Sequence, residues 1–147
     1  MAGIVLLLHL LGATVWTGGH LVLATTLLPR ALRERRIDGL LAFESAYERI
    51  GMPALALQVL TGLWLAHRLQ PDLGAWLDWR QPVSRLLMLK LGLLALTGAF
   101  AVHARLRVLP RLSPATLPLL AWHVVPVTLL AVAFVVVGLS FRTGWLY

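Results

Sequence analysis

The sequence predicts an all-α integral membrane protein, folded as an antiparallel up-down bundle of four transmembrane helices. Three observations predict this fold class. Hydrophobic residues make up 59% of the 147 residues and charged residues only 13%; the mean hydropathy is +0.83; and four apolar stretches are long enough to cross a bilayer. A soluble domain of this length needs more polar surface than this composition supplies. We therefore expect a single membrane domain over residues 1–147.

The individual helices follow from the length of the apolar stretches. About 20 apolar residues cross the hydrocarbon layer as a helix, and the stretches that meet this length are, approximately, 3–28, 46–69, 84–109 and 116–140. Each contains Gly or Pro, which membrane helices tolerate. No basic segment precedes the first stretch, so we expect it to be a retained helix and not a signal peptide. The short connections predict antiparallel neighbours.

The arginines predict the orientation of the bundle. The first and third connections, with the adjoining helix ends, carry eight bases: Arg30, Arg33, Arg35, Arg36, Arg49, Arg105, Arg107 and Arg111. The opposite side carries four: Arg68, Arg80, Arg85 and Arg142. Because the side with more bases faces the cytoplasm, we expect a multi-pass inner-membrane protein with both termini on the periplasmic side. The same rule explains the net charge of +7, so the expected partner is the lipid bilayer and not nucleic acid.

Ionisable side chains inside the predicted spans are the candidate site residues, because such groups are costly in hydrocarbon and usually functional. They are His9, His20, His67, His103, His123 and Lys90. The helix directions sort them into an outer layer of His9, His67 and Lys90 and an inner layer of His20, His103 and His123. The alternative interpretation is structural, since imidazoles also tie neighbouring helices together by hydrogen bonds.

The spacing of the two histidines in the first helix predicts a cofactor. Eleven residues separate His9 from His20, which places both on one helix face, about 16 Å apart along the axis. Neutral imidazole is an axial ligand of haem iron and also a ligand of copper. We therefore expect His9 and His20 to bind one or two haem b groups, completed by His67 in the outer layer and by His103 or His123 in the inner layer.

Residues beside these histidines suit a bound macrocycle. Gly18 and Gly19 would let a flat ring or another helix come close to His20. Lys90 and Arg30 could contact haem propionates or an anionic substrate, whereas the alternative for Lys90 is that its side chain reaches the headgroups. The predicted cofactor-binding set therefore includes both cations.

Four segments carry a family resemblance. The first span contains LHLLGATVWTGGHLVLATTLLPRAL, which resembles the CopD family of membrane copper-resistance proteins and shares their Trp-x-Gly-Gly. Further segments are similar to the same family: FESAYERIGMPALALQVLTGLWLA, LMLKLGLL and HVVPVTLLAVAFVVVGLSFRTG. The same skeleton is similar to the HemJ-type protoporphyrinogen oxidases, which are related four-helix haem proteins.

The HemJ-type resemblance implies roles for three positions. It matches His9 to the first-helix histidine, Leu28-Pro29-Arg30 to a Leu-Pro-Arg motif and Lys90 to the third-helix lysine. Two departures stand beside these matches. Val125 replaces the Glu that precedes the fourth-helix proline in that family, and His20 is additional. The missing carboxylate weakens the implied oxidase activity.

Three functions remain open from the sequence. The first is a haem b protein that transfers electrons or oxidises a lipophilic substrate such as a quinol or a porphyrinogen, and so acts as a membrane oxidoreductase. The second is copper transport or tolerance through a histidine-lined site, although the chain has no Cys and only three Met, the soft ligands that Cu(I) prefers. The third is a non-enzymatic subunit of a larger membrane complex or homo-oligomer. Physical chemistry favours haem, and the family name favours copper.

Overall fold

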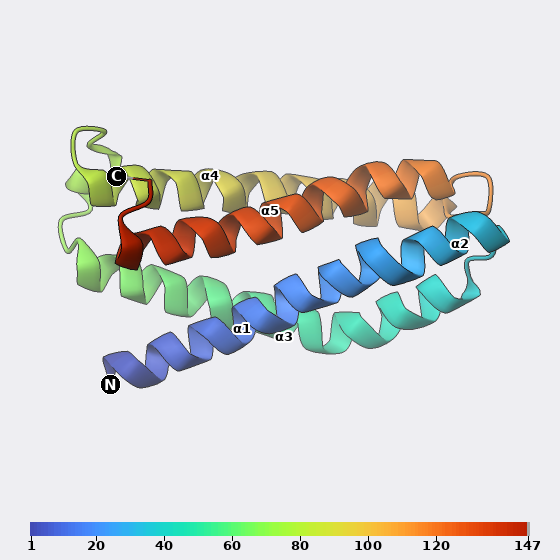
Figure 1. Ribbon diagram of the computed structural model, residues 1–147, viewed down its shortest axis with the longest axis horizontal. Helices are drawn as coiled ribbons and strands as arrows, with labels where there is room; N and C mark the ends of the chain where they lie inside the picture. The colour runs from blue at the N-terminus through green and yellow to red at the C-terminus, as the bar shows by residue number, and fades with distance from the viewer. Residues whose placement is uncertain (147) are drawn as a thin grey trace.

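The computed structural model describes residues 1–146, which form four long antiparallel helical spans and contain no strand (Figure 1). The spans are Ala2–Glu34, Asp38–Leu69, Pro82–Arg111 and Leu117–Thr143, and each is long and apolar enough to cross a membrane. This confirms the predicted fold class. Both termini lie at the same end of the bundle (Figure 1). We call this end, which also holds the 70–81 connection, the terminal end, and the opposite one the basic end.

The first and third spans each contain a π-helical turn near the basic end. The first consists of α1 (Ala2–Val22), the π-helix η1 (Leu23–Leu27) and α2 (Leu28–Glu34). The third consists of α4 (Pro82–His103), the π-helix η3 (Ala104–Val108) and the 3₁₀ turn η4 (Leu109–Arg111). In both spans Leu-Pro-Arg follows the π-helix directly. Because proline has no N–H and its ring crowds the carbonyl one turn earlier, the wider turn relieves that contact.

The second and fourth spans are the single helices α3 (Asp38–Leu69) and α5 (Leu117–Thr143). The helix predicted over about 46–69 thus begins eight residues earlier, and the one predicted to end near 28 continues to Glu34. The polar residues after position 28 continue the first helix because the backbone keeps right-handed helical geometry up to Glu34. Arg35 breaks this geometry, since its φ of 51° is left-handed, a conformation that commonly ends a helix.

The bundle is built from two helix pairs. α1 packs on α3, α4 packs on α5, and α1 also contacts α5, which joins the pairs. Glycines allow the first pair to come close: a Cβ at Gly12 would lie 2.9 Å from the backbone oxygen of Ala54. In lipid, where burial of apolar surface gives no drive for association, such close backbone contact is what holds helices together.

Two apolar clusters hold all four spans together. The larger one, at the basic end, consists of Leu28, Ala31, Leu40, Val108, Leu117, Leu120 and Val124. The smaller one lies further toward the terminal end and consists of Trp16, Val127 and Ala131, with Leu55 and Phe100 packed against them. The interior at the basic end is therefore closed by apolar side chains.

α3 and α4 make few close backbone contacts within residues 1–146, and side-chain contacts tie the second and third spans near their two ends. At the terminal end, Gln70 donates from Nε2 to Gln81 Oε1 at 2.8 Å, and its backbone oxygen accepts from Trp76 Nε1 at 2.8 Å. Trp76 belongs to the 3₁₀ turn η2 (Gly74–Leu77). At the basic end, Arg105 pairs with Glu48. We call the length between these ties the α3–α4 seam.

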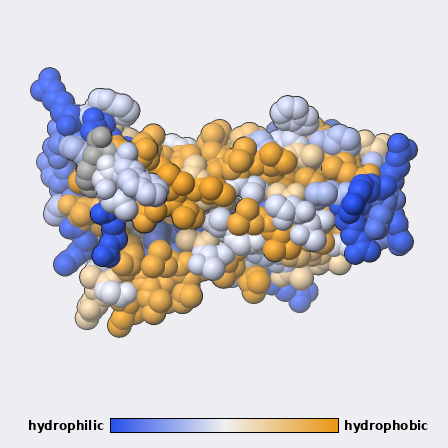
Figure 2. All heavy atoms as spheres, in the orientation of Figure 1, coloured by the Kyte–Doolittle hydropathy of each residue, from blue (hydrophilic) through white to orange (hydrophobic). Residues whose placement is uncertain are grey.

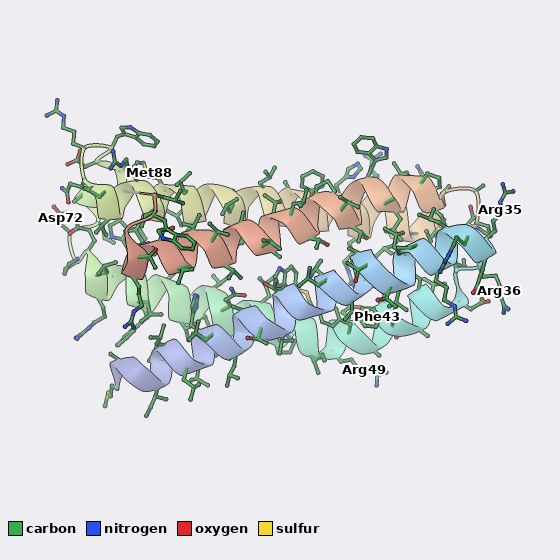
Figure 3. All side chains as sticks on the ribbon, viewed as in Figure 1. Arg35, Arg36, Phe43, Arg49, Asp72 and Met88 are labelled. Atoms are coloured by element: carbon green, nitrogen blue, oxygen red, sulfur yellow. The ribbon has the colours of Figure 1, made fainter. Side chains whose placement is uncertain are left out.

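The surface has the distribution expected of a membrane protein. Figure 2 shows apolar side chains along the flanks and hydrophilic ones gathered at both ends of the long axis. Figure 3 shows Arg35 and Arg36 at the basic end and Asp72 at the terminal end. Large apolar side chains on the flanks, such as Leu60 and Leu129, are exposed and would contact lipid. The cytoplasmic placement of the basic end stays a prediction.

Arg35→Gly is expected to stabilise the protein. The left-handed conformation costs a residue with a Cβ roughly 1–2 kcal/mol and costs glycine almost nothing, so the free energy of unfolding should rise by about 1 kcal/mol. The matched control is Arg33→Gly, at a right-handed position inside α2, which should lower stability by roughly 0.5–1 kcal/mol. Unfolding in detergent measures both, and a loss of stability in Arg35→Gly would contradict the assigned backbone conformation.

Candidate functional site: the intramembrane histidines

Three of the five histidines lie inside the bundle and hold their rings in the same way. Nδ1 of His9 is 3.0 Å from the backbone oxygen of Gln58, Nδ1 of His20 is 2.9 Å from that of Trp16, and Nδ1 of His123 is 2.9 Å from that of Leu119. A carbonyl oxygen only accepts, so the proton of each neutral ring is on Nδ1. Each ring therefore presents the lone pair of Nε2, which is the arrangement typical of metal-binding imidazoles.

His9 is held by α3. Besides the Gln58 carbonyl, its Nδ1 lies 3.0 Å from Thr61 Oγ1, and that hydroxyl donates to the Leu57 oxygen at 2.6 Å. The ring also covers Gly62, where a Cβ would lie 3.0 Å from His9 Cε1. The ammonium of Lys90 is close enough to act on His9 electrostatically. His9 thus lies in a polar layer in the half of the bundle nearer the terminal end.

His20 lies between two aromatic side chains. Its ring centroid is 4.4 Å from that of Trp16 and 6.0 Å from that of Tyr47, which meets it edge-on. The Tyr47 hydroxyl donates to the backbone oxygens of Val15 and Trp16 at 3.0 and 3.1 Å. As predicted, His9 and His20 share one face of α1, since both contact α3.

Tyr47 was not among the residues predicted for the site, although Gly19 indicated that a bulky group would pack at this position. Gly19 was predicted to admit a flat macrocycle or another helix, and the structure places the Tyr47 ring directly over it. A Cβ at Gly51, on α3, would also lie 2.9 Å from that ring. Gly18 has open space at the same position. The close approach that the glycines predicted is thus made by a side chain of α3.

His103 and His123 form a direct pair between α4 and α5. His103 Nδ1 is 2.7 Å from His123 Nε2, and the rings lie edge to edge with centroids 4.9 Å apart and planes 9° from parallel. Because His123 donates from Nδ1 to Leu119, its Nε2 accepts, and His103 is the donor. Phe100 meets the His123 ring edge-on at 5.9 Å. His123 is 8% exposed, whereas His103 is exposed.

The other predicted site residues are His67, Arg30 and Lys90. His67 was predicted to complete a site with His9, but it is exposed near the end of α3. The hydrogen-bond partners of His9 on α3 are instead Gln58 and Thr61. Arg30 forms an exposed ion pair with Glu34 at 2.9 Å. The ammonium of Lys90 lies 5.7 Å from the ring centroid of Phe141 on α5.

The arrangement limits the coordination that the chain can offer. Within residues 1–146 no three His, Asp or Glu side chains come together as a metal-binding group. The imidazole pair on α4 and α5 offers two nitrogen ligands at one place, and His20 offers one. Of the histidines predicted as haem ligands, His9, His20 and His123 lie inside the bundle, whereas His67 and His103 are exposed. The haem itself stays a prediction.

Comparison with known proteins gives one family. Residues 41–140 match the sequence model of the family described as copper resistance protein D (CopD). This range covers most of α3 and all of α4, and it reaches Ser140 in α5. No curated protein and no solved structure matches the chain.

Gly19→Ala is expected to destabilise the protein, because the new methyl group would overlap the Tyr47 ring. Overpacking of this kind costs about 1–3 kcal/mol, and the displaced ring would also move from His20. The adjacent Gly18→Ala is the control, since nothing lies within 4 Å of its Cβ, and it should leave stability unchanged or raise it. Unfolding of both variants in detergent tests this, and equal stabilities would mean that Tyr47 does not occupy this slot.

Proposed function

Because this chain belongs to the copper resistance protein D family, we propose that it is a membrane protein that binds copper within the bilayer, with His103 and His123 as the ligands. The observation that carries the proposal is the direct contact of the two ring nitrogens at 2.7 Å. Copper is the substrate of this site and not a resident cofactor.

The chemistry of the pair suits copper. Imidazole nitrogen is a good copper ligand, and the two facing nitrogens are joined by a single N–H···N hydrogen bond. On binding, copper would lie between Nδ1 of His103 and Nε2 of His123. The proton of His103 would then move from Nδ1 to Nε2 of the same ring. The rings have only to separate from hydrogen-bond distance to admit a metal ion. The Leu119 carbonyl fixes the orientation of His123, as an outer partner of a metal ligand does.

The surroundings of the pair suit a step in metal transfer. His103 is at the surface of the bundle and His123 is buried, so a copper ion bound by the pair would lie between the surface and the interior. Toward the basic end from His123 lie Leu120 and Leu117, and both belong to the larger apolar cluster. That cluster would keep water from the bound ion, which strengthens its attraction to the imidazoles.

A second candidate function is haem b binding at His20, which one observation favours. The Nδ1–H of His20 is fixed by the Trp16 carbonyl, and within residues 1–146 no hydrogen bond is made by its Nε2. This donor set fits a single axial imidazole. A bound haem would supply one-electron chemistry, while the chain would supply the ligand, the aromatic wall of Trp16 and the low dielectric of the interior.

His103→Ala and His123→Ala are each expected to lose copper. Removing a direct ligand should weaken binding by more than the roughly 10- to 100-fold that removal of an outer partner costs. The measurement is titration of the detergent-purified protein with Cu(I) against a chromogenic Cu(I) chelator, with metal content determined independently. His67→Ala is the control, because its ring is exposed and lies outside the pair.

Two results would contradict the copper site. Retention of wild-type affinity by both variants of the pair would exclude these histidines as ligands. A Soret band with sharp reduced α-bands that disappears in His20→Ala, in a protein that takes up no copper, would favour haem b instead.

A further inference from the structure

Lys90 is a cation within a membrane span whose contacts in the described part of the chain include no carboxylate. The chain has six acidic residues, and their contacts are to other groups. Glu34, Asp38 and Glu48 pair with arginines at the basic end, and Glu44 lines a surface pocket with Glu48 and Arg105. Asp72 and Asp78 accept from backbone N–H groups of the 70–81 connection. A membrane cation without a carboxylate partner among residues 1–146 points to a ligand that supplies the opposite charge.

The ammonium of Lys90 is held in place by α5. It lies over the Phe141 ring, 5.7 Å from the centroid, and only 3.4 Å from where a Cβ of Gly138 would be. Since α5 ends at Thr143, these contacts put the ammonium within about one and a half helical turns of the terminal end, or roughly 8 Å. This is the depth at which the polar head of an amphiphile meets its acyl chain.

Unpaired acceptors lie in the same half of the bundle. His9, which is within electrostatic reach of Lys90, presents the lone pair of Nε2. Gln58, whose backbone oxygen accepts the His9 proton, has a buried side-chain Oε1 without a partner among the described residues. A bound carboxylate would accept a hydrogen bond from the Lys90 ammonium. A water molecule bound to that carboxylate would donate to one of the unpaired acceptors.

The α3–α4 seam is the place where such a ligand would enter from the bilayer. Lys90 is on α4 and Gln58 is on α3, and these two helices make few close backbone contacts. A ligand that entered between them would not pass through water. The access route therefore favours an amphiphile over a water-soluble anion.

From these observations we propose that the half of the bundle nearer the terminal end holds a binding site for the carboxylate head of a lipid-soluble amphiphile, with Lys90 as the residue that pairs with it. The acyl chain lies in the α3–α4 seam. This site is separate from the proposed copper ligands, so either proposal can fail without the other.

The test compares a spin-labelled stearate with its methyl ester, which has the same chain without the charge. The protein is placed in bilayer nanodiscs of uncharged lipid, and electron paramagnetic resonance measures the immobilised fraction of each label. The wild type should bind the acid at least about tenfold more tightly than the ester, the fold-change expected of a charge-assisted hydrogen bond. Lys90→Met should remove this preference, and Lys90→Arg should keep most of it.

Arg68→Met is the matched control, because Arg68 is a cation at the same end that also lies over an aromatic ring, 5.6 Å from that of Trp64. It is exposed, and its loss should leave the preference for the acid intact. The helical circular dichroism and the gel-filtration peak of Lys90→Met, measured in parallel, should match those of the wild type and so report that the variant is folded. Equal binding of acid and ester by the wild type, or an unchanged preference in Lys90→Met, would overturn the proposal. Displacement of the label by acetate as readily as by oleate would overturn the assignment to an amphiphile.

Discussion

The close contact of α1 with α3 is the constraint on which the arrangement of the site depends. Glycines on both helices remove the side chains that would keep the backbones apart, and larger groups from the opposite helix fill the space. The Tyr47 ring lies over Gly19, and the His9 ring lies over Gly62. Because the backbones are so close, His9 reaches a carbonyl and a hydroxyl of α3. The same packing therefore holds the bundle together and orients two imidazoles.

Helix α5 has the complementary role. It contacts α1 through Thr128, whose hydroxyl lies 3.2 Å from the His20 backbone oxygen, and it contacts α4 through the His103–His123 pair. Its residues contribute to both apolar clusters. The proposed copper ligands consequently lie beside the apolar core. Lys90 lies toward the terminal end, beyond both apolar clusters, and contacts the ring of Phe141. The two proposed sites differ in depth because the packing of α5 differs along its length.

The sequence predicted the spans well and the contacts less well, for physical reasons. Apolar length identifies a span because hydrocarbon excludes polar backbone and side chains, and an eleven-residue spacing fixes a shared face because the helical period is regular. The pairing of His103 with His123 could be placed only at a common depth, since it also depends on how α4 and α5 rotate about their axes. Tyr47 was missed because it lies in a mixed polar stretch before the most apolar part of α3. The earlier start of α3 was missed because polar residues such as Glu44 remain helical outside the apolar stretch.

The two π-helical turns have a consequence for how the spans are compared with others. A hydrogen-bonded ring of a π-helix contains one residue more than that of an α-helix, so η1 and η3 each insert a residue into an otherwise regular period. Without that insertion, everything that follows would be rotated by about 100° about the helix axis. Leu28, which follows η1, and Leu109, which follows η3, would then turn away from the larger apolar cluster. A homologous span that runs as a plain α-helix must therefore align with this one across a one-residue gap just before its Leu-Pro-Arg. Only an alignment that includes this gap assigns the correct residues of such a span to the face that packs in the core.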